Sequence, residues 1–275
     1  MTETTLAFIG SGNMTGSLVG GLIADGWEPE RIHIADPDPQ QTERLARRFS
    51  VVTTADNQTA VKHADAIVLA VKPQVIRTVA GELALLIGQR HPLVISIAAG
   101  IRETSLRDWL GKDTAIVRAM PNTPALVQSG ATALYANAAV SEEQHNLAES
   151  ILRAVGLVIW VNEEAMMDTV TALSGSGPAY FFLLMEALTS AGSRMGLPED
   201  TARLLVLQTA FGAAKMALES ADDAAQLRRR VTSPGGTTEC AIGEFQKSNF
   251  EGIVLQALQA AANRSRELAA EFGKG

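Results

Sequence analysis

The first half of the chain alternates short apolar runs with stretches of helical character. Residues 6–9 precede a glycine-rich segment and a helical pattern over 14–25, and residues 31–35 form a second apolar run before a polar-faced helix over 39–49. Further runs at 66–71, 93–97, 115–118 and 157–161 are predicted to be strands. A continuous apolar run such as 66–71 is typical of a strand buried on both faces of a parallel sheet. Strands that alternate with helices predict a doubly wound α/β domain.

The pattern changes near residue 162, after which no strand is predicted. Stretches rich in Ala, Leu, Met and Gln over 164–173, 179–195, 199–219, 239–247 and 250–271 predict helices, with Gly, Pro or Ser between them. We therefore predict an α/β domain over 1–162 and an all-helical domain over 163–275. Residues 180–185 are apolar on every side, and a small domain can bury such a helix only if another subunit covers it. This predicts dimerisation through the second domain.

Composition narrows the class of protein. The 275 residues are 47% apolar and carry a net charge of −7, which suits folded cores and argues against nucleic-acid or anionic-membrane partners. Cys240 is the only cysteine and the four histidines are scattered, so we predict neither a disulfide nor a metal site. No apolar run is long enough to span a membrane, and the first residues lack the pattern of a signal peptide. We expect a soluble, cytoplasmic protein.

Residues 8–16, FIGSGNMTG, lie between the first strand and the first helix. Glycines in this position allow a tight turn, and they let a pyrophosphate approach the amide groups at the start of the helix. Taken alone, the string is equally consistent with an ordinary turn. The second strand, however, ends in an acidic residue, Asp36, 20 residues after Gly16. The combination predicts a dinucleotide-binding site.

Asp36 bears on which dinucleotide binds. An acid at the end of the second strand usually accepts hydrogen bonds from ribose hydroxyls and repels a 2′-phosphate, which favours NAD. Asp36 can instead begin the turn DPDP and cap the next helix. Arg44, Arg47 and Arg48 on that helix can reach a phosphate or simply face solvent. These residues leave the choice between NAD and NADP open.

Other strands end in residues suited to a ligand, because ligands of open α/β sheets bind at the carboxyl ends of the strands. Residues 70–73, AVKP, bring Lys72 to this edge, either as a cofactor contact or as a solvated lysine. The small residues of 97–100, IAAG, permit close contact with a nicotinamide ring, and 120–124, MPNTP, form a rigid polar loop.

The second domain contains two glycine-rich segments, 174–178 and 233–238, each at the start of a predicted helix. They either cap these helices or present N–H groups and hydroxyls to an anion such as a substrate carboxylate. No histidine, cysteine or paired carboxylate accompanies them. Hydride transfer to a polarised C=N or C=O group fits such a site, because it needs little acid–base help from the protein.

The strings FIGSGNM, AVKPQ, SIAAG, MPNTPA, TALSGSGPAYFF and RRRVTSPGGTTE occur in this order along the chain. In them the chain resembles the pyrroline-5-carboxylate reductase family over essentially its whole length. The resemblance implies a Rossmann-type doubly wound N-terminal domain followed by an all-α C-terminal dimerisation domain. It also implies reduction of L-1-pyrroline-5-carboxylate to L-proline by NADPH or NADH, the last step of proline biosynthesis. Members form homodimers that often assemble into decamers.

The resemblance also assigns roles to residues. Substrate carboxylate binding falls on Ser233 and on the backbone of Gly236, Thr237 and Thr238, while the hydroxyl of Thr238 is expected to bond the ring nitrogen and serve in catalysis. Two departures stand out: Thr15 replaces a small residue, and Asp36 stands where many members carry a residue suited to a 2′-phosphate. Besides Asp36, the cofactor contacts fall on Ile9, Gly10, Ser11, Gly12, Asn13, Met14, Asn57, Ala70, Val71, Lys72, Pro73, Ile97, Ala98 and Ala99.

Three other functions remain as alternatives. A β-hydroxyacid dehydrogenase shares the two-domain plan but uses a lysine on the first buried helix of its second domain, and residues 169–193 contain neither Lys nor Arg. An imine reductase is a second alternative. A non-catalytic NAD(P)H sensor is the third, and the two substrate-type loops count against it.

Overall fold

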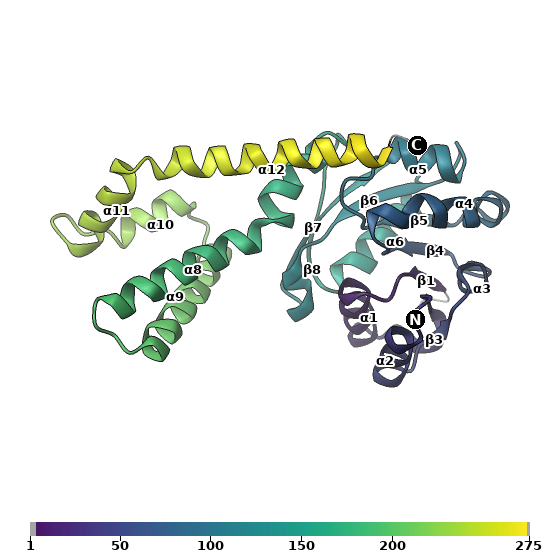
Figure 1. The fold of residues 1–275 in the computed structure, drawn as a ribbon, viewed down its shortest axis with the longest axis horizontal. Coiled ribbons are helices and arrows are strands. Elements are labelled where there is room, and N and C mark those ends of the chain that lie inside the picture. Colours follow the sequence, from purple (N-terminus) through teal and green to yellow (C-terminus); the bar gives the residue numbers. More distant parts are fainter. Residues whose placement is uncertain (1–3, 274–275) are drawn as a thin grey trace. The chain divides into compact units, whose positions relative to one another are not determined.

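The computed structural model describes residues 4–273, which form two compact units. The first unit runs to Ser176 and also includes the segment that begins at Ala260, and the second unit is Gly177–Gln259. The first unit is built on an eight-stranded sheet of order β3-β2-β1-β4-β5-β6-β7-β8 (Figure 1). Neighbouring strands are parallel, except that β7 runs antiparallel to β6. The strands are β1 Leu6–Ile9, β2 Ile32–Ala35, β3 Val52–Thr54, β4 Ala66–Leu69, β5 Leu93–Ser96, β6 Ile116–Met120, β7 Gly130–Ala136 and β8 Gly156–Trp160.

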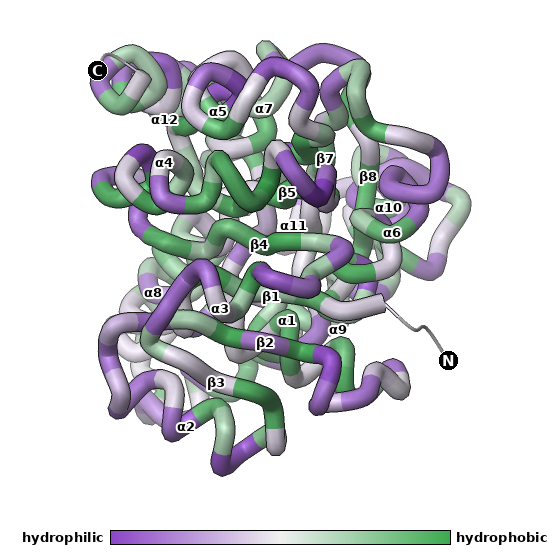
Figure 2. The backbone as a smooth tube through the Cα atoms, turned by 90° about the vertical axis from the view of Figure 1, so that its right-hand side faces the viewer, coloured by the Kyte–Doolittle hydropathy of each residue, from purple (hydrophilic) through white to green (hydrophobic). Residues whose placement is uncertain are grey.

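Helices cover both faces of this sheet, as expected of a doubly wound domain. One core cluster joins Phe8 and Leu18 to residues of the helix that begins after Ser141, and the other joins Ile9 to Ile76 and Leu106. Figure 2 shows β4 and β5 coloured mainly as hydrophobic, which agrees with their complete burial. The helices are α1 Asn13–Ala24, α2 Pro39–Phe49, α3 Asn57–Val61, α4 Pro73–Arg90, α5 Glu103–Leu110, α6 Glu142–Arg153, α7 Met166–Val170 and the last part of α12 Phe250–Gly273.

The second unit is helical, with α8 Gly177–Arg194, α9 Glu199–Glu219, α10 Ala224–Arg230, α11 Thr237–Lys247 and the first part of α12. Within residues 177–259 only Gly177 and Ala202 are buried. Large apolar side chains are exposed along α8, α9 and α12, among them Phe181, Phe182 and Leu204. A single copy of this unit therefore has almost no core of its own, which is the situation expected of a surface that a second subunit covers.

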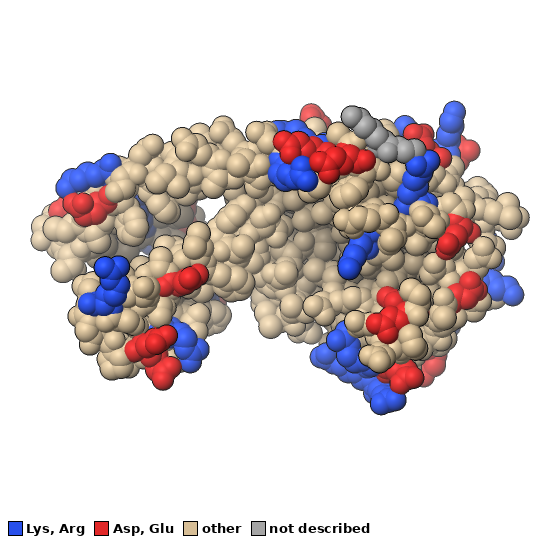
Figure 3. All heavy atoms as spheres, in the orientation of Figure 1, with Lys and Arg blue, Asp and Glu red and all other residues tan. Residues whose placement is uncertain are grey.

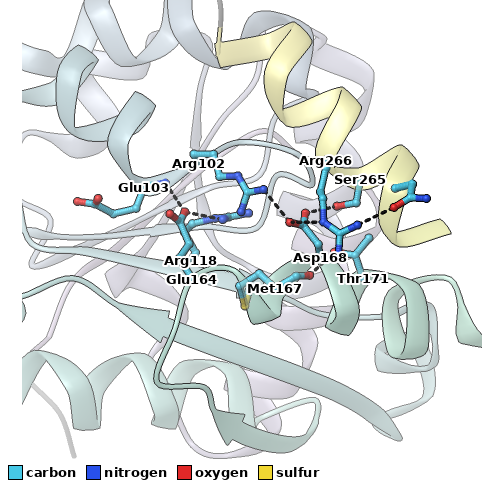
Figure 4. Close-up of polar contacts among 10 residues, drawn as sticks. Arg102, Glu103, Arg118, Glu164, Met167, Asp168, Thr171, Ser265 and Arg266 are labelled. Carbon is cyan, nitrogen blue, oxygen red and sulfur yellow. Dashed lines mark hydrogen bonds and ion pairs between the residues drawn. The ribbon is translucent and has the colours of Figure 1, made fainter. Parts of the chain in front are cut away.

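The first compact unit includes helix α7 and the end of α12, and a buried polar network ties them to it (Figure 4). The boundary between residues 162 and 163 stays a prediction about the domains. Asp168 of α7 accepts hydrogen bonds from Arg102 Nη2 at 2.6 Å and from Ser265 Oγ of α12 at 2.7 Å. Nearby, Arg118 Nη1 donates to Glu164 Oε1 at 2.5 Å. Burial lowers the pKa of Arg118, and the charge of Glu164 opposes that shift.

Several local predictions differ from the structure. Strands β3 and β7 and helix α10 were not predicted. Residues 174–178 do not form a loop, because a π-helical turn over Thr171–Gly175 continues α7 and leads to α8, which begins at Gly177. The cause is that this turn closes with a hydrogen bond from Ser176 N to Thr171 O at 2.8 Å, so the glycines are accommodated within helical backbone.

No helix among the described residues is long and apolar enough to cross a membrane. Nor do three or more His, Cys, Asp or Glu side chains gather within 4–273 as ligands of a metal ion would. On the face drawn in Figure 3, basic and acidic side chains of the first unit lie in small, mixed groups.

Candidate cofactor and substrate sites

A cleft of about 850 Å³ opens in the first unit at the carboxyl ends of β1, β2 and β4. This is the edge at which ligands of open α/β sheets bind. Nine of the residues expected to contact a cofactor line it: Ile9, Gly10, Ser11, Gly12, Asp36, Asn57, Ala70, Val71 and Lys72.

The turn after β1 has the geometry that a pyrophosphate requires. Gly10 has φ of +103°, and a Cβ at this position would lie 2.7 Å from the carbonyl oxygen of Ala70, so no side chain fits there. A Cβ on Gly12 would instead meet no atom within 4 Å. Gly12 is the N-cap of α1 and supplies no side-chain cap, which leaves the first amides of α1 available to an anion. These residues fit a dinucleotide.

Thr15 occupies the position where the dinucleotide motif usually has its third glycine. The side chain is fully buried, and its hydroxyl donates a hydrogen bond to the carbonyl oxygen of Gly10 at 2.7 Å. This hydrogen bond links the first turn of α1 to the glycine turn that precedes it. This departure from the family pattern has its own structural role.

Asp36 is held by donors on both of its carboxylate oxygens. Oδ2 accepts hydrogen bonds from the backbone N–H and from the hydroxyl of Ser11, both at 2.8 Å, and Oδ1 accepts one from Asp38 N at 2.9 Å. The cap of α2 is Asp38, whose Oδ1 accepts a hydrogen bond from Gln40 N. Asp36 therefore begins the turn after β2 and also faces the cleft, while Asp38 caps the helix.

The other six predicted cofactor residues do not line the cleft within the described first unit. Asn13 and Met14 begin α1, Pro73 begins α4, and residues 97–99 follow β5 beside the end of β4, where Ile97 N donates to Leu69 O at 3.1 Å. The arginines of α2 are also elsewhere. Arg44, Arg47 and Arg48 line a separate depression along that helix.

Several lining residues were not predicted, including Asp56, Gln58 and Glu82. Asp56 and Gln58 follow β3, so the β-branched run at 51–54 is the signal that could have located them. Asp56 caps α3, and hydrogen bonds from the hydroxyl and amide of Thr59 hold the pKa of its carboxyl below the ordinary value. Glu82 Oε2 accepts a hydrogen bond from Asn57 Nδ2 at 3.1 Å.

The predicted substrate loop lies in the second unit between α10 and α11. Gly236 is the N-cap of α11 and supplies no side-chain cap, and its own N–H donates to Ser233 O at 3.0 Å. The N–H groups of Thr237 and Thr238 begin the helix, so they have no carbonyl partner within it. Ser233 and Thr237 are exposed and Thr238 is half-buried. The loop thus offers amides and hydroxyls to an anion.

The loop after β6 contacts the other predicted segment. Asn122 Nδ2 lies 3.3 Å from both the carbonyl oxygen and the hydroxyl of Ser174, and Asn122 Oδ1 accepts a hydrogen bond from Ala131 N at 2.9 Å. Asn122 thereby links β7 to the π-helical turn. The 120–124 loop is fixed by these contacts.

A doubly wound sheet with a glycine turn, an acid at the end of β2 and an uncapped helix start defines a dinucleotide-binding protein. Comparison with known proteins agrees. A family model described as NADP oxidoreductase coenzyme F420-dependent matches residues 5–100, and one described as pyrroline-5-carboxylate reductase dimerisation matches 164–268. The pyrroline-5-carboxylate reductase of Pseudomonas aeruginosa is 52% identical over 100% of both chains. The chain belongs to the pyrroline-5-carboxylate reductase family and is an NAD(P)H-dependent oxidoreductase.

Solved structures give the same result. A pyrroline-5-carboxylate reductase from Coxiella burnetii has a TM-score of 0.94 at 48% identity and covers 98% of this chain and 99% of its own. The Plasmodium falciparum enzyme, solved with NADP bound, has a TM-score of 0.86 at 30% identity, with the same coverage of both chains. These likenesses confirm the predicted fold, a Rossmann-type domain followed by a helical dimerisation domain.

Proposed function

We infer that the chain reduces L-1-pyrroline-5-carboxylate to L-proline with hydride from NADPH or NADH, the last step of proline biosynthesis. The observation that carries this inference is the cleft around the glycine turn, within a chain that matches reductases of this name over its full length. NAD(P)H supplies the hydride when bound.

We assign the cofactor to the cleft of the first unit. The amides at the start of α1 face the pyrophosphate, and Gly12 leaves room for it because no atom lies within 4 Å of the place of a Cβ. Asp36 accepts a hydrogen bond from the ribose, and Lys72 lies at the carboxyl end of β4 on the same cleft. Residues 97–99 follow the neighbouring strand, where their small side chains allow the nicotinamide to approach.

We assign the substrate carboxylate to the loop before α11. The hydroxyl of Ser233 and the N–H groups of Thr237 and Thr238 are donors suited to a carboxylate, and the helix dipole favours an anion at this end. The N–H of Gly236 already donates to Ser233 O, so Gly236 contributes by shaping the loop. The hydroxyl of Thr238 bonds the ring nitrogen. A protonated imine is the better hydride acceptor, so a hydroxyl at the nitrogen orients the ring and holds or relays its proton as hydride reaches C5.

The reaction is tested by mixing the protein with the substrate and either nucleotide and following absorbance at about 340 nm. Oxidation of neither nucleotide would refute the assignment and favour a non-catalytic sensor.

The role of Thr238 has its own test. Thr238→Ala is expected to lower kcat/KM by about 10- to 100-fold, the range for losing a hydrogen bond to a charged group. Ser248→Ala, at the exposed C-cap of the same helix, is the matched control. Unchanged kinetics for Thr238→Ala would remove Thr238 from the mechanism.

We also propose the assembly and the location. Self-association follows from the dimerisation family match and from the exposed apolar helices of the second unit. A homodimer formed through these helices, assembled further into a decamer, is the state that the family resemblance implies, and sedimentation distinguishes two copies from ten. We place the enzyme in the cytoplasm, where the reduced nucleotides of biosynthesis are held, and fractionation of cells checks this.

A further inference from the structure

We propose that Asp36 makes this enzyme select NADH over NADPH. The inference deepens the proposed function, because it rests on a dinucleotide binding in the cleft of the first unit. The family fold itself accepts a 2′-phosphate, since the Plasmodium falciparum relative is solved with NADP bound. Any preference must therefore come from the residues at the ribose end of this particular cleft.

The carboxylate of Asp36 is fixed in place. The N–H and hydroxyl of Ser11 hold Oδ2, and the N–H of Asp38 holds Oδ1, so the side chain cannot swing away from an incoming phosphate without losing three hydrogen bonds. A carboxylate offers about four acceptor positions, so one remains for a ribose hydroxyl, which is a donor. A 2′-phosphate presents only acceptor oxygens when ionised, so it gains no hydrogen bond here and meets a like charge.

The rest of the cleft wall adds to this effect. Besides Asp36, the acidic residues Asp38, Asp56 and Glu82 line it. Asp56 stays ionised, because the hydrogen bonds from Thr59 lower its pKa. Among the lining residues of the described unit, Lys72 is the only base, and it lies at the end of β4 rather than of β2.

The nearby bases of α2 lie outside the cleft. Arg47 pairs with Glu43 at 2.7 Å, and the guanidinium of Arg48 lies 4.7 Å from the centre of the Phe49 ring. With Arg44 these arginines line the separate depression, so none of the three lines the nucleotide cleft. The cation that usually neutralises a 2′-phosphate in such folds is thus missing from the cleft wall.

The test is the ratio of dissociation constants for NADPH and NADH, measured by fluorescence titration of the full chain. We expect NADH to bind at least about tenfold more tightly, because one like-charge contact near the surface has that effect or more. Asp36→Asn keeps the size of the side chain and removes its charge, and it should bring the ratio to within about threefold of one. The substitution also weakens the hydrogen bonds from Ser11 to residue 36. Any loss of affinity from this cause affects both nucleotides equally, so it cancels in the ratio of their dissociation constants.

Two further variants make the test specific. Asp25→Asn removes the same charge at the exposed C-cap of α1, outside the cleft, and should leave the ratio as in the wild type. Asp36→Ser combined with Pro37→Arg adds the missing cation and should invert the preference.

Equal or tighter binding of NADPH by the wild type would overturn the inference, as would an unchanged ratio in a folded Asp36→Asn protein. Binding of neither nucleotide would overturn the proposed function as well. A clear NADH preference without turnover of pyrroline-5-carboxylate would refute the proposed function and leave the role of Asp36 standing.

Discussion

Replacing Asp168 with alanine should release the end of α12 from the first unit. Asp168 accepts hydrogen bonds from Arg102 and Ser265, so it joins α7 both to the segment before α5 and to α12. Its side chain is only 6% exposed, whereas that of Arg102 is 26% exposed. Truncation therefore removes both hydrogen bonds, together with the ion pair between Asp168 and Arg266 at 4.0 Å. It leaves the buried hydroxyl of Ser265 and the partly buried guanidinium of Arg102 without this partner.

The magnitude follows from these exposures. Breaking a fully buried ion pair costs about 3–5 kcal/mol, because the partner charge is left without compensation. Water can reach Arg102 in part, which lowers the cost, while the loss of the Ser265 bond adds about 1 kcal/mol. We expect about 2–3 kcal/mol in the free energy of opening this segment, or roughly a 30- to 150-fold rise in its opening constant.

Hydrogen exchange measured by mass spectrometry is the suitable assay, because peptides from 260–273 report on this segment separately. Exchange there should accelerate in Asp168→Ala, while peptides from β4 change less. Asp168→Asn keeps an acceptor for Ser265 and should show a smaller effect. Glu267→Gln, which removes an exposed partner of Arg264 on the same helix, should change nothing measurable. Equal exchange in Asp168→Ala and the wild type would refute the view that this network anchors α12.

Three other outcomes can be checked. Gly10→Ala should lower the melting temperature, because its Cβ would meet the backbone of Ala70 just after β4. Gly12→Ala should keep that temperature, and in fluorescence titrations it should weaken nucleotide binding at least about tenfold. Thr59→Ala should raise the pKa of Asp56 toward 3.8, and an NMR titration of this carboxyl measures the change. In the wild type the stabilisation by this carboxylate is present above pH 3.8, and it is lost as the pH falls through the lower pKa of the folded state. Phe182→Glu places a charge in the exposed apolar face of α8 and should yield monomers in sedimentation; an unchanged mass would count against that face.

Sequence patterns located the central strands and the nucleotide turn because their signals are local. β4 and β5 are continuous apolar runs, and both are buried on each face of the sheet. β3 has three residues, none of them buried, so its pattern is weak. β7, with the sequence GATALYA, is rich in alanine, which does not favour strands, and it is held by pairing with β6 and β8.

The predicted site was located less completely for a similar reason. Residues next to the glycine motif could be found, whereas Asp56 and Glu82 reach the cleft only through the pairing of β3 and the course of α4. The attachment of α12 also has no local signal, because the residues it buries are small: Ala262, Ser265 and Ala269. Their burial depends on partners about 100 residues earlier in the chain, as the bond from Ser265 to Asp168 shows.

The return of α12 to the first unit sets an order for folding during synthesis. Phe272 packs against the core cluster of Ile9 and Leu106. A Cβ placed on Gly100 would lie 3.3 Å from the Cβ of Leu268, so α12 passes close to this glycine. A ribosome must therefore translate the whole helical excursion of residues 177–259 before the surface around Gly100 and Asp168 can be covered. Until then the nascent chain leaves the carboxylate of Asp168 without its bond from Ser265, and it leaves the apolar side chains that pack against Phe272 uncovered. Newly made chains therefore keep the surface around Asp168 uncovered until residues 260–273 have been made.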